Sequence, residues 1–136
     1  MPERIISSLS GRLPEPLLII PSDTWNTFEL SGAEDEFVNV LFVAVWSKNK
    51  ERLFEINEEA ECKTKKYMSI TGMRGTGVKV PKTITQKYGI RPNHYLEVVL
   101  KSVRKGSETI EIFPKREVFE HFPKGFESVP EKENKT

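Results

Sequence analysis

The stretch from Gly75 to Leu100, GTGVKVPKTITQKYGIRPNHYLEVVL, contains local signals for a strand, a short helix, a turn and a second strand. Apolar and polar residues alternate over 77–80, which is the period of a half-buried strand. Pro81 has a fixed φ and no N–H, so it suits the first position of a helix. Gly89 can adopt the left-handed conformation that ends a helix. The order of these local signals along the chain predicts a compact strand–helix–strand unit.

The flanking residues predict more strands. Residues 95–103 and 109–113 are typical of two strands joined by a hairpin loop that contains Gly106. Upstream, residues 66–71 predict a first strand, and residues 72–77 are expected to form its turn. The chain is therefore expected to be mostly β with short helices.

The first half of the chain repeats this order of elements. Residues 18–56 align with residues 78–112, so that Pro21 falls on Pro81 and FVNVLF (37–42) falls on YLEVVL (95–100). Residues 4–9 are the expected opening strand of the first copy. Glu29 replaces the glycine that ends the second helix, so the first turn is expected to be built differently. We interpret the pattern as a diverged tandem duplication; the alternative is a chance similarity of two strand-rich segments.

The alignment predicts four segments. They are a diverged acidic repeat (1–57), a charged linker without periodic pattern (58–65), a basic repeat (66–113) and an aromatic, charged tail (114–136).

Composition limits the class of protein. The 136 residues, 37% hydrophobic and 30% charged, are enough for one ordinary domain or two very small units. The longest apolar run, residues 37–46, is half the ~20 residues that a membrane-spanning helix needs and is typical of a buried strand. No signal sequence is evident, and the single cysteine, Cys62, excludes an internal disulfide. We expect a cytoplasmic protein that does not enter membranes.

The net charge of +1 hides an asymmetry between the two halves. Residues 1–60 hold five Lys/Arg and eleven Asp/Glu, and residues 61–136 hold the other 16 Lys/Arg and nine Asp/Glu. The halves therefore carry −6 and +7. The asymmetry indicates different partners for the halves, or halves that face each other; uneven surface charge without function is the third interpretation.

Residues 74–113 resemble the AbrB/SpoVT/MazE family of swapped-hairpin DNA-binding domains. The similar elements are GTGVKVP (75–81), KTITQKYG (82–89), Ile90, RPN (91–93) and the two strands that follow. The resemblance implies an AbrB-like swapped-hairpin β-barrel formed by two tandem repeats, an arrangement similar to that of the MraZ proteins. One copy alone is too small to bury a core.

The resemblance also implies a function and a site. It implies a non-enzymatic transcriptional regulator that binds double-stranded DNA through the basic second repeat, as a homodimer or higher oligomer. The implied DNA-binding residues are Lys65, Lys66, Arg74, Lys79 and Lys82, since lysine and arginine contact phosphates. An ordinary solvated basic face is the alternative. The corresponding turn of the first repeat holds Arg12 but also Glu15 and two prolines, so it is not a second basic turn. Three interpretations follow: DNA binding is one-sided, dimers pair two basic halves, or the acidic half binds protein.

Other chemistry has little support in the sequence. Trp25 and Trp46 are expected in the core or an interface, and stacking on nucleic-acid bases is the alternative. His94 and His121 have no companions at metal-ligand spacing, and Cys62 has no nearby histidine. We expect no catalytic residues, no metal and no cofactor.

The tail suggests a second function. Phe119, Phe122 and Phe126 make it too apolar for a simple disordered end, and they are the candidate partner-binding residues. In related antitoxins the segment after the barrel binds the toxin. The alternative function is therefore a protein-interaction module, an antitoxin or an assembly subunit, that uses the acidic repeat and the tail; RNA or ribosome binding is a third option.

Overall fold

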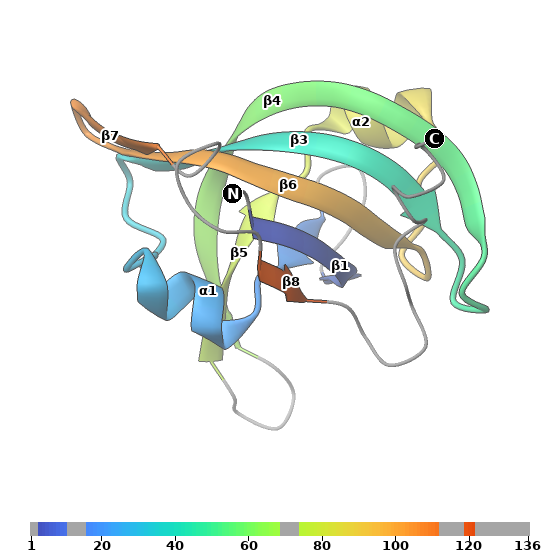
Figure 1. Cartoon of the computed structure of the whole chain (residues 1–136), viewed down its shortest axis with the longest axis horizontal. Helices are drawn as coiled ribbons and strands as arrows, with labels where there is room; N and C mark the ends of the chain where they lie inside the picture. Colours follow the sequence, from blue (N-terminus) through green and yellow to red (C-terminus); the bar gives the residue numbers. More distant parts are fainter. Residues whose placement is uncertain (1–2, 11–15, 69–73, 112–118, 122–136) are drawn as a thin grey trace.

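The computed structural model describes residues 3–10, 16–68, 74–111 and 119–121, and these form mainly strands with two short helices (Figure 1). The expectation of a mostly β chain is confirmed. The elements in chain order are β1 (Glu3–Ser10), β2 (Leu17–Ile19), α1 (Ser22–Thr27), β3 (Glu36–Trp46), β4 (Arg52–Met68), β5 (Arg74–Lys79), α2 (Lys82–Lys87), β6 (Tyr95–Lys105), β7 (Glu108–Glu111) and β8 (Phe119–His121).

The strands close into a ring. The hydrogen-bonded order is β7-β6-β3-β4-β5-β2-β1-β8, and an additional pairing of β6 with β1 joins the two sides. β7 extends from β6 and β8 from β1, outside the closed circuit (Figure 1). The curvature of β3, β4 and β6 lets these long strands wrap around one interior.

The core fills the ring because side chains alternate along each strand. In β3, Val38, Val40 and Phe42 are fully buried, and in β6 the buried set is Leu96, Val98 and Leu100. Ile5 of β1, Leu18 of β2 and Val78 of β5 belong to the same cluster. Both halves of the chain therefore contribute to one core.

In two antiparallel strand pairs, the residues opposite each other at the centre are also equivalent in the alignment of residues 18–56 with residues 78–112. β2 pairs with β5 with Leu18 opposite Val78, and β3 pairs with β6 with Leu41 opposite Val99. The pairing of β1 with β6 also crosses between the halves, and the second part of β4 pairs with β3. The pairs β1–β2, β4–β5 and β6–β7 each lie within one half.

The two helices end alike, contrary to expectation. Gly89 has φ +61° after α2, and Glu29 has φ +53° after α1. In each turn the next amide reaches back to the helix: Leu30 N–H donates to the Trp25 carbonyl at 2.8 Å, and Ile90 N–H donates to the Thr85 carbonyl at 2.9 Å. The first turn is thus not built differently, and Glu29 adopts the left-handed conformation that glycine adopts more easily.

Residues 58–65 were expected to be a linker, and they instead form the middle of β4. The side chains of Ala60, Cys62 and Thr64 turn inward, and the charged residues between them turn outward. These inward residues are small or only moderately apolar, and their neighbours are charged. The alternation of inward and outward positions is therefore hard to recognise in the sequence. The division of the chain into repeats 1–57 and 66–113 remains a prediction.

Candidate nucleic-acid interface

The predicted DNA-binding residues lie on the β4–β5 hairpin and the start of α2. Lys65 pairs with Gly77 and Lys66 with Thr76 across the two strands. Arg74 is the first residue of β5, opposite Met68. Lys79 is the last residue of β5 and Lys82 the first residue of α2. The structure therefore brings the predicted positions onto one supersecondary unit.

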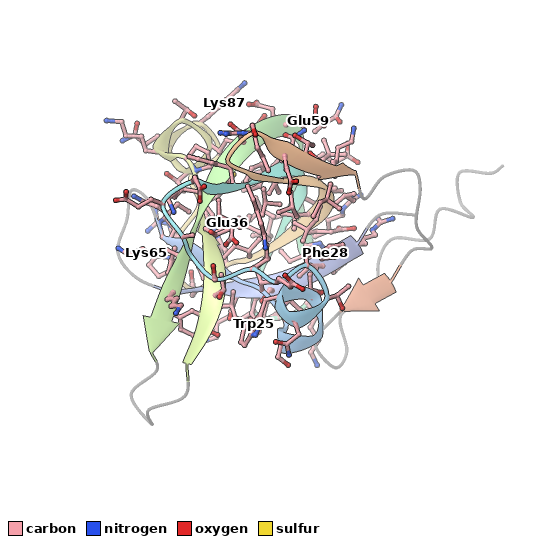
Figure 2. The ribbon with its side chains drawn as sticks, turned by 90° about the vertical axis from the view of Figure 1, so that its left-hand side faces the viewer. Trp25, Phe28, Glu36, Glu59, Lys65 and Lys87 are labelled. Carbon is pink, nitrogen blue, oxygen red and sulfur yellow. The ribbon has the colours of Figure 1, made fainter. Side chains whose placement is uncertain are left out.

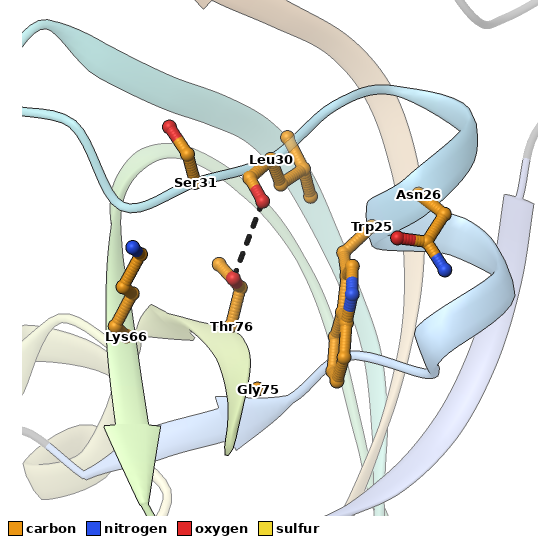
Figure 3. Close-up of a pocket in the computed structure, with 7 residues that line it drawn as sticks. All are labelled: Trp25, Asn26, Leu30, Ser31, Lys66, Gly75 and Thr76. Atoms are coloured by element: carbon orange, nitrogen blue, oxygen red, sulfur yellow. Dashed lines mark hydrogen bonds between the residues drawn. The ribbon is translucent and has the colours of Figure 1, made fainter.

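The two adjacent lysines of β4 point to opposite faces, as neighbours on a strand must. Thr64 and Val78 form an inward, fully buried pair, so Lys65 and Lys79 lie on the outer face of the hairpin. Lys65 is visible at this surface in Figure 2. Lys66 turns to the opposite face, toward the segment that follows α1 (Figure 3). The predicted set is thus divided between two surfaces.

Many cations elsewhere in the chain pair with carboxylates. Lys87 Nζ lies 2.6 Å from Glu58, Lys101 Nζ lies 2.9 Å from Glu59, and Arg104 Nε lies 2.8 Å from Glu61. Glu58 and Lys87 are both at the surface, and the ion pair and hydrogen bonds from Lys87 and Tyr88 lower the pKa of Glu58. Of the alternatives for the charge asymmetry, contact between acidic and basic halves is therefore present.

The lysines of the candidate interface differ from these paired cations. Lys65, Lys66 and Lys82 are exposed, and within the described ranges no ion pair joins any of them to a carboxylate. Their charge is consequently not neutralised locally by the described acidic residues. A negatively charged partner would meet an uncompensated positive surface here.

A buried carboxylate holds the segment beside this hairpin. Glu36, 1% exposed, accepts hydrogen bonds from the backbone N–H groups of Ser31 and Gly32, both at 2.8 Å, and from the hydroxyl of Thr64 at 2.6 Å. Burial alone would raise its pKa, but these hydrogen bonds outweigh burial and lower the pKa below 4.5. Glu36 therefore fixes residues 31–36 against β4.

A pocket of about 290 Å³ lies between α1 and the hairpin, and sequence reasoning missed it (Figure 3). Its lining residues are Trp25, Asn26, Leu30, Ser31, Lys66, Gly75 and Thr76. The sequence placed Trp25 in a core or an interface, and the structure shows it half-buried, packed against the core on one side and open to the pocket on the other. The two glycines of β5, Gly75 and Gly77, are the signal that could have indicated close packing across this hairpin.

Trp46 is buried, as predicted, and has a polar partner that the sequence did not reveal. Its indole N–H donates to Glu97 at 3.0 Å, and the Arg4 Nε–H donates to the same carboxylate at 2.9 Å. Glu97 is fully buried on β6. This cluster supplies hydrogen-bond partners to a buried charge and connects β1, β3 and β6.

Cys62 is packed in the core, where burial raises the pKa of its thiol to about 12. The thiol is consequently protonated at neutral pH and poorly suited to nucleophilic attack. Among the described residues, no three His, Cys, Asp or Glu side chains gather where they could hold a metal ion.

Of the three predicted partner-binding residues, only Phe119 lies among the residues that the structure describes. Phe119 lies on β8, which runs parallel to β1 with Phe119 opposite Glu3. Phe122 and Phe126 lie outside the described residues. The role of all three remains a prediction.

Comparisons with known proteins add no assignment. No family model, no curated protein and no solved structure matches this chain. Among the helices that the structure describes, none has the length and apolar character needed to cross a membrane.

Proposed function

We propose that the chain is an AbrB-like swapped-hairpin barrel built from two tandem repeats. The pairings of β2 with β5 and of β3 with β6 support this proposal. At the centre of each pairing, the two opposite residues are equivalent positions of the two repeats, as an internal two-fold axis between the repeats requires. The crossed pairings support it as well: β1 joins the strand of the other half, β6, and the second part of β4 joins β3.

We further propose that this protein is a non-enzymatic, DNA-binding transcriptional regulator. The observation that carries the proposal is the group of exposed lysines on the β4–β5 hairpin and α2, Lys65, Lys66 and Lys82, which form no ion pair with the described carboxylates in a molecule where other cations do. Lys65 and Lys79 on the outer face, with Lys82 just beyond, would contact phosphates of double-stranded DNA. Arg74 begins β5 on the same hairpin, and its contact with DNA is part of the proposal.

A regulator of this kind would act as a homodimer. Its second copy supplies the second basic hairpin that a two-fold DNA site needs, since the first repeat lacks the corresponding lysines. The proposed dimer requires no exchange of strands between chains, because the ring closes within one chain.

The experiment compares two double variants that lose the same charge. Lys65→Ala with Lys82→Ala removes two exposed lysines of the interface, and Lys48→Ala with Lys50→Ala removes two exposed lysines of the β3–β4 turn. Binding to duplex DNA is measured by fluorescence anisotropy over a salt series. We expect the interface variant to bind duplex DNA more weakly. The slope of log K against log salt concentration should also be shallower, by about one unit for each phosphate that the variant no longer neutralises.

The control variant should retain wild-type affinity and salt dependence. Equal reductions in the two variants would mean that net charge, not this surface, governs binding. Absence of duplex binding by the wild-type chain at low salt, with both general and selected sequences, would contradict the proposed function.

A protein-interaction module remains the second candidate, and the edge of the sheet favours it. Among the described strands, β7 pairs only with β6, and its Ile110 is 44% exposed. An unpaired edge with an exposed apolar side chain can accept an added strand from a partner. The predicted tail surface, Phe119, Phe122 and Phe126, is tested by deleting residues 114–136: failure to capture a partner that the full chain captures would favour this candidate over DNA binding.

A further inference from the structure

We propose that the pocket between α1 and the β4–β5 hairpin binds one unpaired nucleotide, with its base stacked on Trp25 and its phosphate at the ammonium group of Lys66. This inference deepens the proposed nucleic-acid binding and rests on it for the class of partner. It adds a site for a base on the face of the hairpin opposite to Lys65 and Lys79, the lysines proposed to contact duplex phosphates.

The geometry of the pocket fits a flat ring beside a negative charge. Figure 3 shows the indole of Trp25 edge-on, with one face turned toward the hollow and toward Lys66 on the far side. The side chain of Lys66 rises from β4 toward Ser31, and Asn26 projects from α1 beside Trp25. The pocket thus presents an aromatic face and a cation across the hollow, with the amide of Asn26 at its border beyond the indole.

The floor of the pocket depends on a residue without a side chain. A Cβ on Gly75 would lie 2.7 Å from the Trp25 ring and 2.6 Å from the Tyr67 ring. Because glycine occupies this position, Trp25 can rest directly on β5. The indole is therefore held in place by the strand beneath it.

The wall opposite the floor is also fixed. The Thr76 hydroxyl donates to the Leu30 carbonyl at 3.3 Å, and Glu36 holds the backbone N–H groups of Ser31 and Gly32. Lys66 is anchored by its backbone pairing with Thr76. The site is consequently formed before a ligand arrives, which lowers the entropic cost of binding.

The chemistry of these groups favours a nucleotide. Every base has a π-face that can stack on an aromatic ring, and a lysine beside such a ring can contact the adjoining phosphate. An asparagine amide can both donate to and accept from the edge of a base. A volume of about 290 Å³ lies at the small end of ligand pockets, which suits a single nucleotide unit.

The test uses two labelled single strands of DNA with the same length and the same phosphates, one carrying bases and one abasic throughout. Binding of the full chain to each strand is measured by anisotropy. We expect the strand with bases to bind on the order of tenfold more tightly, because stacking contributes only when a base is present. The ratio of the two affinities, the base ratio, reports the pocket separately from the charged surface.

Variants of the lining residues assign the base ratio to this pocket. Trp25→Leu should bring the ratio close to one, and Asn26→Ala, at an exposed position, should reduce it without affecting the fold. Lys66→Ala should weaken binding of both strands. Phe54→Ala, which removes another aromatic residue, 49% exposed and on β4 outside the pocket lining, should leave the ratio unchanged. Thermal melting of each variant controls for loss of folding.

Each outcome separates this inference from the proposed function. A base ratio near one in the wild-type chain, a ratio that survives both Trp25→Leu and Asn26→Ala, or no binding of either strand overturns the pocket. Binding of the single strand with a Trp25-dependent ratio, but none of the duplex at low salt, supports the pocket and rejects duplex-DNA binding.

Discussion

Glu36 shows how a single residue stabilises this fold through its charge. Its carboxylate is enclosed by three hydrogen-bond donors, the N–H groups of Ser31 and Gly32 and the hydroxyl of Thr64, with Lys105 Nζ at 3.7 Å. These donors stabilise the charged form and lower its pKa, despite burial. Glu36 therefore links the segment after α1 to β4 and to β6.

We predict that Glu36→Gln lowers the free energy of unfolding at pH 7 by about 1.5–3 kcal/mol, the range for hydrogen bonds to charged groups. The pKa of Glu36 is lower in the folded than in the unfolded chain, so its contribution is present above pH 4.5 and is lost as the pH falls through the folded pKa. The difference between wild type and variant should therefore shrink below pH 4.5, as measured by urea unfolding at several pH values.

Glu34→Gln is the matched control, because Glu34 lies in the same segment but is exposed. It should have little effect at any pH. A difference between wild type and Glu36→Gln that stays constant through the acidic range would show that shape, not charge, explains the role of Glu36.

At the scale of residues, the sequence predicted the basic positions but not their surroundings. The lysines at 65, 66 and 82 are exposed, as a nucleic-acid surface requires. The role of Glu36 and the partners of Trp25, which was expected in the core or an interface, were not predicted, because the contacts come from strands about 28 to 50 positions away. Local patterns carry no information about such partners.

The ends of the two helices give a direct comparison at the scale of elements. Both turns place one residue at positive φ, Glu29 after α1 and Gly89 after α2. The left-handed conformation costs an L-residue about 1–2 kcal/mol, whereas glycine adopts it readily. The first helix therefore ends with a backbone cost that the second avoids.

We predict opposite effects of two reciprocal substitutions. Glu29→Gly should raise the free energy of unfolding by about 0.5–1 kcal/mol, since relief of the backbone exceeds the added entropy of the unfolded chain. Gly89→Ala should lower it by about 1 kcal/mol; no atom lies within 4 Å of the added Cβ, so the cost is that of the backbone alone. Urea unfolding with an unchanged m-value measures both.

A loss of stability in Glu29→Gly would indicate that its side chain makes a contribution greater than the strain. An unchanged stability in Gly89→Ala would mean that the turn relaxes to another conformation.

The long strand β4 shows why one element was predicted poorly. Its residues 58–65 carry mostly charged side chains, which lowered their apparent strand character in the sequence. In the ring these charges face outward and bind cations of α2 and β6, and only Ala60, Cys62 and Thr64 face the core. Tertiary pairing with β3 therefore outweighed a weak local preference.

At the scale of the whole molecule, the two halves complete each other. β1 pairs with β6, β2 with β5 and β3 with β6, and the core contains residues from both halves, so closure of the ring and burial of the core depend on contact between the halves. The acidic residues of the first half also neutralise part of the charge of the second. Part of the charge asymmetry between the halves is therefore offset by direct ion pairs.

We predict that a cut in the Ser47–Glu51 turn yields fragments that fold only together. A protease site inserted there gives a chain that can be cut after folding. The fragments, roughly residues 1–49 and 50–136, should stay associated in gel filtration, separate in urea and refold only when mixed. Circular dichroism of each isolated fragment should show no cooperative melting.

The uncut chain with the same insertion is the control for the effect of the site itself. Cooperative melting of fragment 50–136 on its own would show that the second half is an independent domain, contrary to the crossed pairings.

The sequence by itself determined the local features of this protein. The apolar run 37–46 predicted β3, alternation over 77–80 predicted the end of β5, and Pro81 and Gly89 predicted the limits of α2, since each signal depends on neighbouring residues. A closed set of strands was expected only through the family resemblance. Tertiary structure decided how the strands pair in the ring, that residues 58–65 join it, and that Trp25 and Lys66 line one pocket. These features depend on contacts between residues distant in the chain, where burial and pairing outweigh local propensity.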